Sequence, residues 1–465
     1  MDDGRQKLSR ESTMDERRQV IEQTPANTED VAGLKTVGEL AVHRPSSIVH
    51  RPSSASCRSC GARGLTTILS LGQTPLANAL LTAEQLHEPE AVYPLELAFC
   101  PRCALVQITE TVPPEKLFRE YFYLSSFSDT MLRHAEETAA RLTRERRLGA
   151  ESLVVEIASN DGYLLQYYKR AGVPVLGIEP ATNIARIAEE ERGIPTVCDF
   201  FGEALARRLK EEGRLADVIH ANNVLAHVAD LNGVIGGFEQ LLKETGVAVI
   251  EVPYVRDMID HCEFDTIYHE HLCYFSLTAL ERLFRRHRLR IRDVEKLSIH
   301  GGTLRIYAGK MTREGEAEEE VSTAVRQMLE EEKEWGVDEA QFYLGFGKKV
   351  SRLRDELLRV LGHLKAQGKS IAVYGASAKG STLLNYFGLG RETLDFVVDR
   401  STVKQGYYTP GTHLLIHAPE RLLEAMPDYV LLLTWNFAEE ILEQQAEYRR
   451  RGGRFIIPIP EVKVI

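Results

Sequence analysis

Residues 152–180 read SLVVEIASNDGYLLQYYKRAGVPVLGIEP and contain the pattern that decides the fold. Two short apolar runs, SLVVEIA and PVLGIE, have the length and composition of buried strands, and GYLLQYYKRAG between them has helical apolar spacing. The alternation continues through the strand-like runs ADVIHANN and GVAVIEVP and the helical stretches IARIAEEERG and LNGVIGGFEQLLKETG. Such an alternation predicts a parallel, doubly wound α/β sheet with right-handed crossovers.

The rest of the chain divides around this sheet. LRIRDVEKL and TLRIYAGK are expected to close it as an antiparallel edge pair. A second α/β alternation, with strands in SIAVYGAS, LDFVVDR, YVLLLTW and RFIIPI and helices in KGSTLLNYFG and AEEILEQQAEYRRRGG, resembles a Rossmann half-fold. The predicted segments are a disordered leader (1–55), a small cysteine-bearing module (56–118), the central α/β domain (119–310), a helical connector (311–368) and a second α/β lobe (369–465).

Composition narrows the functional class. The chain has 465 residues, a net charge of −11 and scattered basic residues, which argues against nucleic-acid binding. It lacks the long apolar run of a transmembrane helix and the apolar core of a secretory signal. We therefore expect a cytoplasmic protein, monomeric or weakly homo-oligomeric, whose seven cysteines are thiols or metal ligands.

The cysteine-bearing module contains two C-x-x-C pairs, separated by a longer gap than in a minimal zinc ribbon. Two intervening residues allow a tight turn to aim both sulfurs of a pair at one ion, and four thiolates complete the closed tetrahedral shell of a structural zinc. The alternative is four independent buried thiols. The predicted zinc ligands are Cys57, Cys60, Cys100 and Cys103, and the isolated Cys198, Cys262 and Cys273 are expected in the core.

A polar turn follows the first strand of the central sheet, where such folds bind cofactors. Glu156-x-Ala158-x-Asn160-x-Gly162 is a degraded glycine-rich loop, and Glu179 ends the second strand, where an acid can bind a ribose diol or simply be solvated. Without G-x-G-x-x-G the loop is unsuited to a dinucleotide, which favours S-adenosylmethionine over a nicotinamide cofactor. The candidate cofactor residues are Glu156, Ala158, Ser159, Asn160, Asp161, Gly162, Glu179, Asp199, Asn222 and Asn223.

Several motifs in combination resemble one known family. They are the paired C-x-x-C module with PLAN (75–78), YFYLSS (121–126), EIASNDG (156–162), YHEH (268–271), HGG (300–302), GASAKG (375–380) and KQGYYTPGT (404–412). From residue 57 to residue 465 the chain resembles the three-domain sugar C-methyltransferases that make branched deoxysugars in antibiotic pathways. One departure is Ala158, where the family usually carries glycine.

The resemblance implies a seven-stranded class I methyltransferase domain and a TDP-linked 4-keto sugar as substrate. Carbon methylation next to a ketone needs a base to form the enolate, and histidine titrates in the right range. The resemblance places that base at His271, with Tyr268, Glu270, His227 and Tyr123 as its partners, whereas His269 is expected to be structural. The implied substrate-binding residues are Asn78, His300, Gly301, Gly302, Ser377, Lys379 and Asp399, of which Ser377 and Lys379 suit a diphosphate and Asp399 a ribose.

Three alternatives remain open at this point. An O- or N-methyltransferase of a small metabolite would use the same cofactor without an enolising base. An NAD-dependent sugar-nucleotide oxidoreductase or epimerase would use the second α/β lobe. A zinc-bearing scaffold would have no activity.

Overall fold

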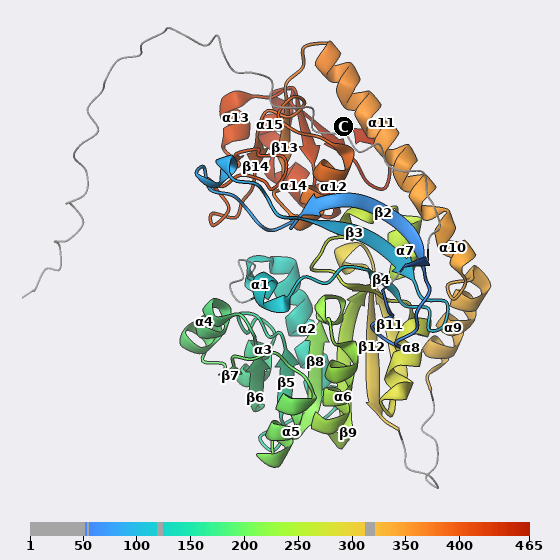
Figure 1. Cartoon of the computed structure of the whole chain (residues 1–465). Helices are drawn as coiled ribbons and strands as arrows, with labels where there is room; N and C mark the ends of the chain where they lie inside the picture. The colour runs from blue at the N-terminus through green and yellow to red at the C-terminus, as the bar shows by residue number, and fades with distance from the viewer. Residues whose placement is uncertain (1–51, 54, 119–123, 312–320) are drawn as a thin grey trace, which may run out of the picture. The chain divides into compact units, whose positions relative to one another are not determined.

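A seven-stranded sheet in the order β11-β12-β9-β8-β5-β6-β7 forms the central domain (Figure 1). Strands β5 to β9 run parallel, and β12 pairs antiparallel with both β9 and β11. This confirms the predicted doubly wound sheet and its antiparallel edge pair. The strands are β5 (Val154–Ile157), β6 (Val175–Ile178), β7 (Thr196–Val197), β8 (Ala216–Asn222), β9 (Leu242–Pro253), β11 (Leu289–Leu297) and β12 (Thr303–Lys310).

Helices cover both faces of this sheet because its strands are apolar on both sides. In β5, Val154 belongs to one buried cluster, while Val155 and Ile157 belong to another. The first cluster also contains residues of α2 (Asp129–Glu145), α3 (Leu165–Arg170) and α4 (Thr182–Arg192). The second contains residues of α5 (Glu203–Glu211), α6 (Leu231–Leu241), α7 (Val255–Asp260) and α8 (Leu277–Arg286). Short 3-10 turns η3 (Leu225–His227), η4 (Phe264–Thr266) and η5 (Ile299–Gly301) complete the domain.

The cysteine-bearing module is an antiparallel sheet that is completed by the central domain. Its own strands are β1 (Pro52–Ser53), β2 (Leu65–Pro75), β3 (Val92–Phe99) and β4 (Val106–Ile108), accompanied by η1 (Gln85–His87), α1 (Pro114–Phe118) and η2 (Ser125–Phe127). The fifth strand, β10 (Cys273–Tyr274), lies far along the chain and pairs with β4. Two modules that look separate in the sequence therefore share one sheet.

The C-terminal lobe has a six-stranded sheet in the order β15-β14-β13-β16-β17-β18, parallel except for β18. Long helix α11 precedes it (Figure 1). The strands are β13 (Ile371–Tyr374), β14 (Val397–Val398), β15 (Ile416–His417), β16 (Tyr429–Leu432), β17 (Arg454–Ile457) and β18 (Lys463–Val464). The helices are α9 (Thr323–Trp335), α10 (Ala340–Leu344), α11 (Phe346–Ala366), α12 (Ala378–Phe387), α13 (Arg421–Ala425), η6 (Trp435–Phe437), α14 (Ala438–Gln444) and α15 (Ala446–Arg450).

These elements come from a computed structural model that describes residues 52–53, 55–118, 124–311 and 321–465. All of them belong to one compact unit, Pro45–Ile465. The predicted leader lies outside the described residues except for its last few positions, of which Pro52 and Ser53 form β1. In the described part of the chain, no helix combines the length and apolarity needed to cross a bilayer.

Several predicted boundaries were wrong. The helix expected from Gly162 begins only at Leu165, because Asn160 and Gly162 have positive φ and prolong the turn. The helix expected over 231–246 ends at Leu241, and strand β9 begins at the next residue. The single helix expected over 438–453 is interrupted at Gln445, which separates α14 from α15.

Candidate active site

The turn after β5 has an unusual backbone. Ala158 and Asn160 both have positive φ, +51° and +49°, and Gly162 has φ +76°. A Cβ on Gly162 would lie 2.8 Å from Cγ1 of Ile194, so only glycine fits there. The side-chain Oδ1 of Asn160 accepts the amide of Ser125, at 2.9 Å, which ties the turn to the segment before α2. The turn is therefore held in a fixed shape at the carboxyl edge of the sheet.

Glu179, which follows β6, lies directly against this turn. Its Oε2 accepts the amide of Asn160 and its Oε1 accepts the amide of Ala181, each at 2.9 Å. Burial raises the pKa of Glu179 to about 7. The carboxyl is therefore where a ribose-binding acid is expected, and it also fixes the loop.

The other candidate cofactor residues lie at different places around the turn. Ser159, Asn222 and Asn223 lie in the turn or at the end of β8, whereas Asp199 is exposed beyond β7. Asp161 is buried and forms an ion pair with Arg192, at 3.1 Å between Oδ2 and Nη1.

Glu156 lies on β5 beneath the turn. It is fully buried, burial raises its pKa well above the usual range, and its Oε2 has no hydrogen-bond partner among the described residues. Glu156 is therefore a buried acid of the sheet directly before the turn.

The four cysteines of the two C-x-x-C pairs meet at one point. Their sulfurs all lie within 4.8 Å of one another, with 3.5 Å between Cys57 and Cys103 and 3.6 Å between Cys60 and Cys100. A tetrahedral zinc with Zn–S bonds of about 2.3 Å requires sulfurs about 3.8 Å apart. The two pairs also form matching backbone turns, since Cys57 N donates to Ala62 O and Cys100 N donates to Leu105 O, each at 2.8 Å. This set of ligands fits a closed structural zinc site.

The isolated cysteines behave differently from one another. Cys262 and Cys273 are buried, as predicted. Cys198 is exposed, which corrects the expectation of a core residue, because it follows β7, the short strand at the edge of the sheet.

His271 is held by hydrogen bonds on both ring nitrogens. Its Nδ1 lies 2.8 Å from the carbonyl oxygen of Thr266, and its Nε2 lies 2.7 Å from the hydroxyl of Tyr268. A carbonyl can only accept, so Nδ1 carries the proton and Nε2 carries the lone pair. Burial lowers the pKa of His271 well below 6.5, helped by the neighbouring His227. The ring is thus neutral, with its basic nitrogen facing Tyr268.

Two more predicted residues lie beside this histidine. The ring of His227 packs edge-on against His271 at 4.7 Å between centroids, and burial lowers its pKa to about 4. Oε1 of Glu270 accepts a hydrogen bond from the side-chain amide of Asn78, at 2.6 Å, and burial raises the pKa of Glu270 to about 7. The structure therefore brings together His271, Tyr268, Glu270, His227 and Asn78.

His269 takes no part in this cluster. It is buried, its Nε2 lies 3.1 Å from the carbonyl oxygen of Pro94 on β3, and its ring packs edge-on against Tyr93. This is the structural role that the sequence predicted.

Lys379 is the only one of the C-terminal candidates whose charged group contacts the central domain in the described structure. Its Nζ lies 4.0 Å from Oε2 of Glu263 and 4.9 Å from the ring centroid of Trp435. Its charge is also felt at His271, whose pKa it helps to lower. Gly301 approaches the same carboxyl, because a Cβ there would lie 2.7 Å from both oxygens of Glu263.

Three further candidate residues contact neighbouring groups of the protein itself. Ser377 caps α12 by accepting the amide of Gly380, at 3.1 Å. Asp399 accepts the amide of Ala376, at 2.7 Å, and that of Ser401, at 2.8 Å. Gly302 has φ +131° and lies against Asp257. Their predicted contacts with substrate stay predictions. Tyr123 and the side chain of His300 lie outside the described residues.

Sequence reasoning missed the segment that orients the base. Glu263, Asp265 and Thr266 lie just before YHEH in EFDTIYHEH. Thr266 supplies the carbonyl that fixes His271, and buried Asp265 accepts the indole N–H of Trp435, at 2.7 Å, from the C-terminal lobe. The sequence signal for this segment was the pair of acids, Glu263 and Asp265, beside YHEH. Their partners in the C-terminal lobe lie more than 100 residues further along the chain.

Comparisons with known proteins agree with this geometry. Residues 57–118 match a family described as a zinc binding domain, 131–294 match a methyltransferase domain, and 298–460 match a C-methyltransferase C-terminal domain. The fold and these matches define an S-adenosylmethionine-dependent methyltransferase. The C-methyltransferase NovU of Streptomyces niveus is 36% identical over 409 residues, which cover 88% of this chain and 96% of NovU. The chain therefore belongs to this C-methyltransferase family.

Two more distant similarities cover single domains. The ubiquinone biosynthesis O-methyltransferase of Rhodopseudomonas palustris (strain BisA53) is 31% identical over 101 residues, 21% of this chain and 38% of that protein. The solved structure of PH0226 from Pyrococcus horikoshii OT3 is 15% identical with a TM-score of 0.34, and covers 43% of this chain and 100% of that one.

Proposed function

We propose that this enzyme methylates a carbon next to the ketone of a TDP-linked 4-keto-deoxysugar. The observation that carries the proposal is the tautomer of His271. A neutral imidazole with Nδ1–H donated to Thr266 leaves Nε2 free of its proton, which is the state a general base needs. An O- or N-methyltransferase would have less use for such a base, because its acceptor atom already carries a lone pair.

The reaction begins with removal of a proton from the carbon beside the ketone. Nε2 of His271 takes this proton, and the electron pair of the C–H bond moves into the enolate. The turn after β5 and Glu179 would hold S-adenosylmethionine, whose methyl group would pass to the enolate carbon with the carbon–sulfur electron pair left on sulfur. Bound S-adenosylmethionine supplies the electrophilic methyl group.

Tyr268 stabilises the negative charge that develops on the ketone oxygen. Its hydroxyl donates to Nε2 of His271, at 2.7 Å, in the structure without substrate; a ketone that takes over this hydrogen bond leaves Nε2 free for the neighbouring C–H. Glu270, fixed by Asn78, is placed to bind a sugar hydroxyl or amine at the same point.

The charge of Lys379 points to where the diphosphate binds. Its ammonium group lies 4.0 Å from Glu263 and helps to lower the pKa of His271, and Lys404 of the same lobe acts in the same way on Glu270. We infer that the nucleotide extends from His271 toward the C-terminal lobe.

The test compares wild type with His271→Asn on a panel of TDP-linked 4-keto sugars. We expect kcat to fall about 10²- to 10⁴-fold, while calorimetry shows unchanged S-adenosylmethionine binding. Solvent deuterium should enter the sugar with wild type even without the methyl donor, and not with the variant. His363→Asn, an exposed histidine on α11, is the matched control and should behave as wild type.

Retention of most turnover by His271→Asn would refute the enolate route and favour transfer to oxygen or nitrogen. Tight NADH binding without binding of S-adenosylmethionine would refute the methyltransferase assignment of the site altogether.

A further inference from the structure

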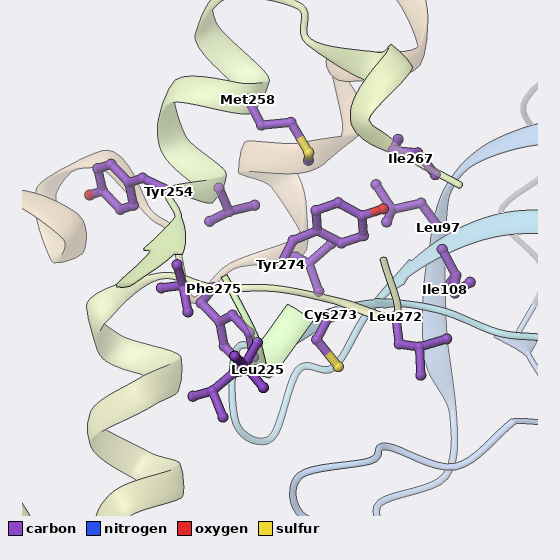
Figure 2. Packing of buried hydrophobic residues seen from close by; sticks show 14 of the residues in the cluster. Leu97, Ile108, Leu225, Tyr254, Met258, Ile267, Leu272, Cys273, Tyr274 and Phe275 are labelled. Carbon is purple, nitrogen blue, oxygen red and sulfur yellow. The ribbon is translucent and has the colours of Figure 1, made fainter. Parts of the chain in front are cut away.

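The catalytic segment is built into the sheet of the zinc-binding module. Cys273 and Tyr274 pair with Gln107 and Val106 on β4, and the amide of Ile108 donates to the carbonyl of Leu272, at 3.0 Å. Figure 2 shows this segment packed among side chains of both domains. The labelled residues include Leu97 and Ile108 from the module, and Leu225, Tyr254 and Met258 from the central domain.

The same segment is held by the module at two further points. His269 contacts the carbonyl of Pro94 on β3, and Glu270 contacts Asn78, which follows β2. Residues on either side of His271 are therefore fixed by the zinc-binding module. The position of His271, which lies between them, therefore depends on the position of that sheet.

Gln107 connects the first cysteine turn to this sheet. Its backbone lies opposite Cys273, and its buried side chain points to the turn that contains Cys57 and Cys60. There Oε1 accepts the amide of Arg58, at 2.9 Å, and Nε2 donates to the carbonyl of Ser56, at 3.2 Å. One amide side chain thus spans from the metal-binding turn to the strand beside β10.

The second cysteine turn reaches β4 along the chain. Cys103 lies three residues before Val106, and the amide of Cys100 donates to the carbonyl of Leu105. Both cysteine turns are therefore connected to β4. The second turn is joined to it along the chain, and the first is hydrogen-bonded to it through Gln107. A bound ion that closes the four sulfurs fixes both turns, and β4 passes that constraint to β10.

We propose that Gln107 is a positioning residue for His271, through which the first cysteine turn of the zinc site sets the geometry of Tyr268 and His271. The effect on turnover rests on the proposed function, whereas the effect on the histidine ring does not. The zinc-binding module thus positions the catalytic histidine in addition to stabilising its own fold.

The test replaces Gln107 with Met, which has a similar length and cannot make either hydrogen bond. We expect kcat to fall about ten- to a hundredfold, because small misplacements of a base have effects of that size. Zinc content by mass spectrometry and S-adenosylmethionine binding by calorimetry should be unchanged. In wild type without substrate, NMR of the histidine ring nitrogens should show His271 in the Nδ1–H tautomer, and in the variant a mixture of tautomers.

Two other variants complete the design. Gln107→Glu keeps an acceptor for the amide of Arg58 but loses the donor to Ser56, and should give an intermediate effect even if the Met variant folds poorly. Gln85→Met is the matched control, because Gln85 is an exposed glutamine of the same module whose side chain accepts the amide of Thr82 in its own turn.

The proposal is overturned if Gln107→Met retains zinc with unchanged kcat and an unchanged His271 tautomer. It is also overturned if zinc and activity are lost in proportion, since Gln107 would then serve metal retention alone. A wild-type enzyme that methylates no sugar would refute the proposed function, yet the NMR comparison would still decide the role of Gln107.

Discussion

The central domain and the C-terminal lobe place a carboxylate at the same point of two different sheets. Glu179 follows the second strand of one sheet and accepts the amides of Asn160 and Ala181. Asp399 follows the second strand of the other and accepts the amides of Ala376 and Ser401. In each lobe the acid ties the first turn to its own strand end. The shared arrangement shows that such an acid can have a structural role before any ligand binds.

The turns that these acids hold differ in chemistry. In the central domain the turn carries buried Asp161, paired with Arg192, and α3 begins only at Leu165, so the turn does not lead directly into a helix N-terminus that could bind a phosphate. In the C-terminal lobe Ser377 caps α12 directly after the turn, which presents free amides of a helix N-terminus. The first turn suits an adenosyl ligand without phosphate, and the second has the form of a phosphate-binding turn.

The zinc-binding module restricts what can use the second turn. Ala77 and Leu80 of that module, together with Gly375, Ala376 and Ser377, line a cavity of about 10 Å³. Such a space holds about one water molecule. A nucleotide diphosphate at this turn, from a sugar nucleotide or from a dinucleotide, would need the module to move away.

The largest effect is expected from replacing Gly375, the first residue of the turn in the C-terminal lobe. Gly375 directly follows β13 and has φ +100°, and a Cβ there would lie 2.6 Å from Cγ2 of Thr434. We expect Gly375→Ala to lower the free energy of unfolding by about 2–4 kcal/mol, from backbone strain and overpacking together. Urea unfolding measures this loss, and an unchanged midpoint would show that the turn has room to relax.

Replacing the two carboxylates separates their roles. Loss of a charged hydrogen-bond partner costs about 1.5–3 kcal/mol, so Glu179→Gln should weaken S-adenosylmethionine binding by about 10- to 100-fold. Asp399→Asn should leave that affinity unchanged, because it lies in the other lobe. Calorimetry measures both, and equal losses in the two variants would remove the distinction between the lobes.

The pH dependence of S-adenosylmethionine binding gives a second test of the role of Glu179. Because burial raises the pKa of Glu179 to about 7, its carboxylate form is lost as the pH falls through that value. Wild-type affinity for S-adenosylmethionine should therefore decline below pH 7. In Glu179→Gln the dependence on this group should disappear.

The sequence predicted the parts of the fold that have local signals. Strand β5 and its neighbours are continuous apolar runs, and the four cysteines have metal-ligand spacing, so both could be identified without coordinates. Strand β10 could not, because Cys273 and Tyr274 are too short a run to show a period, and their partner β4 lies more than 160 residues earlier. Pairings of this kind are decided by tertiary packing.

The site was predictable to the same degree. The end of β6 stands out as a polar residue after a buried strand, whereas the roles in YHEH came from the family resemblance; the structure brings His271, Tyr268, Glu270 and Asn78 together. The contact of Asp265 with Trp435 was not predictable, because it joins two lobes across 170 positions and neither residue belongs to a motif. The partner of a buried acid such as Asp265 is therefore known only from the folded structure.

Ala158 offers the smallest and most direct test of the comparison. It directly follows β5 as Gly375 follows β13, yet it keeps a Cβ at φ +51°. We expect Ala158→Gly to stabilise the protein by about 1 kcal/mol, since glycine removes the left-handed strain. The matched control is Ala171→Gly, at an exposed alanine of the same domain with φ −80°, which should lose stability instead. Thermal unfolding of the full chain compares the two, and a loss in both would mean that Ala158 packs well enough to repay its backbone strain.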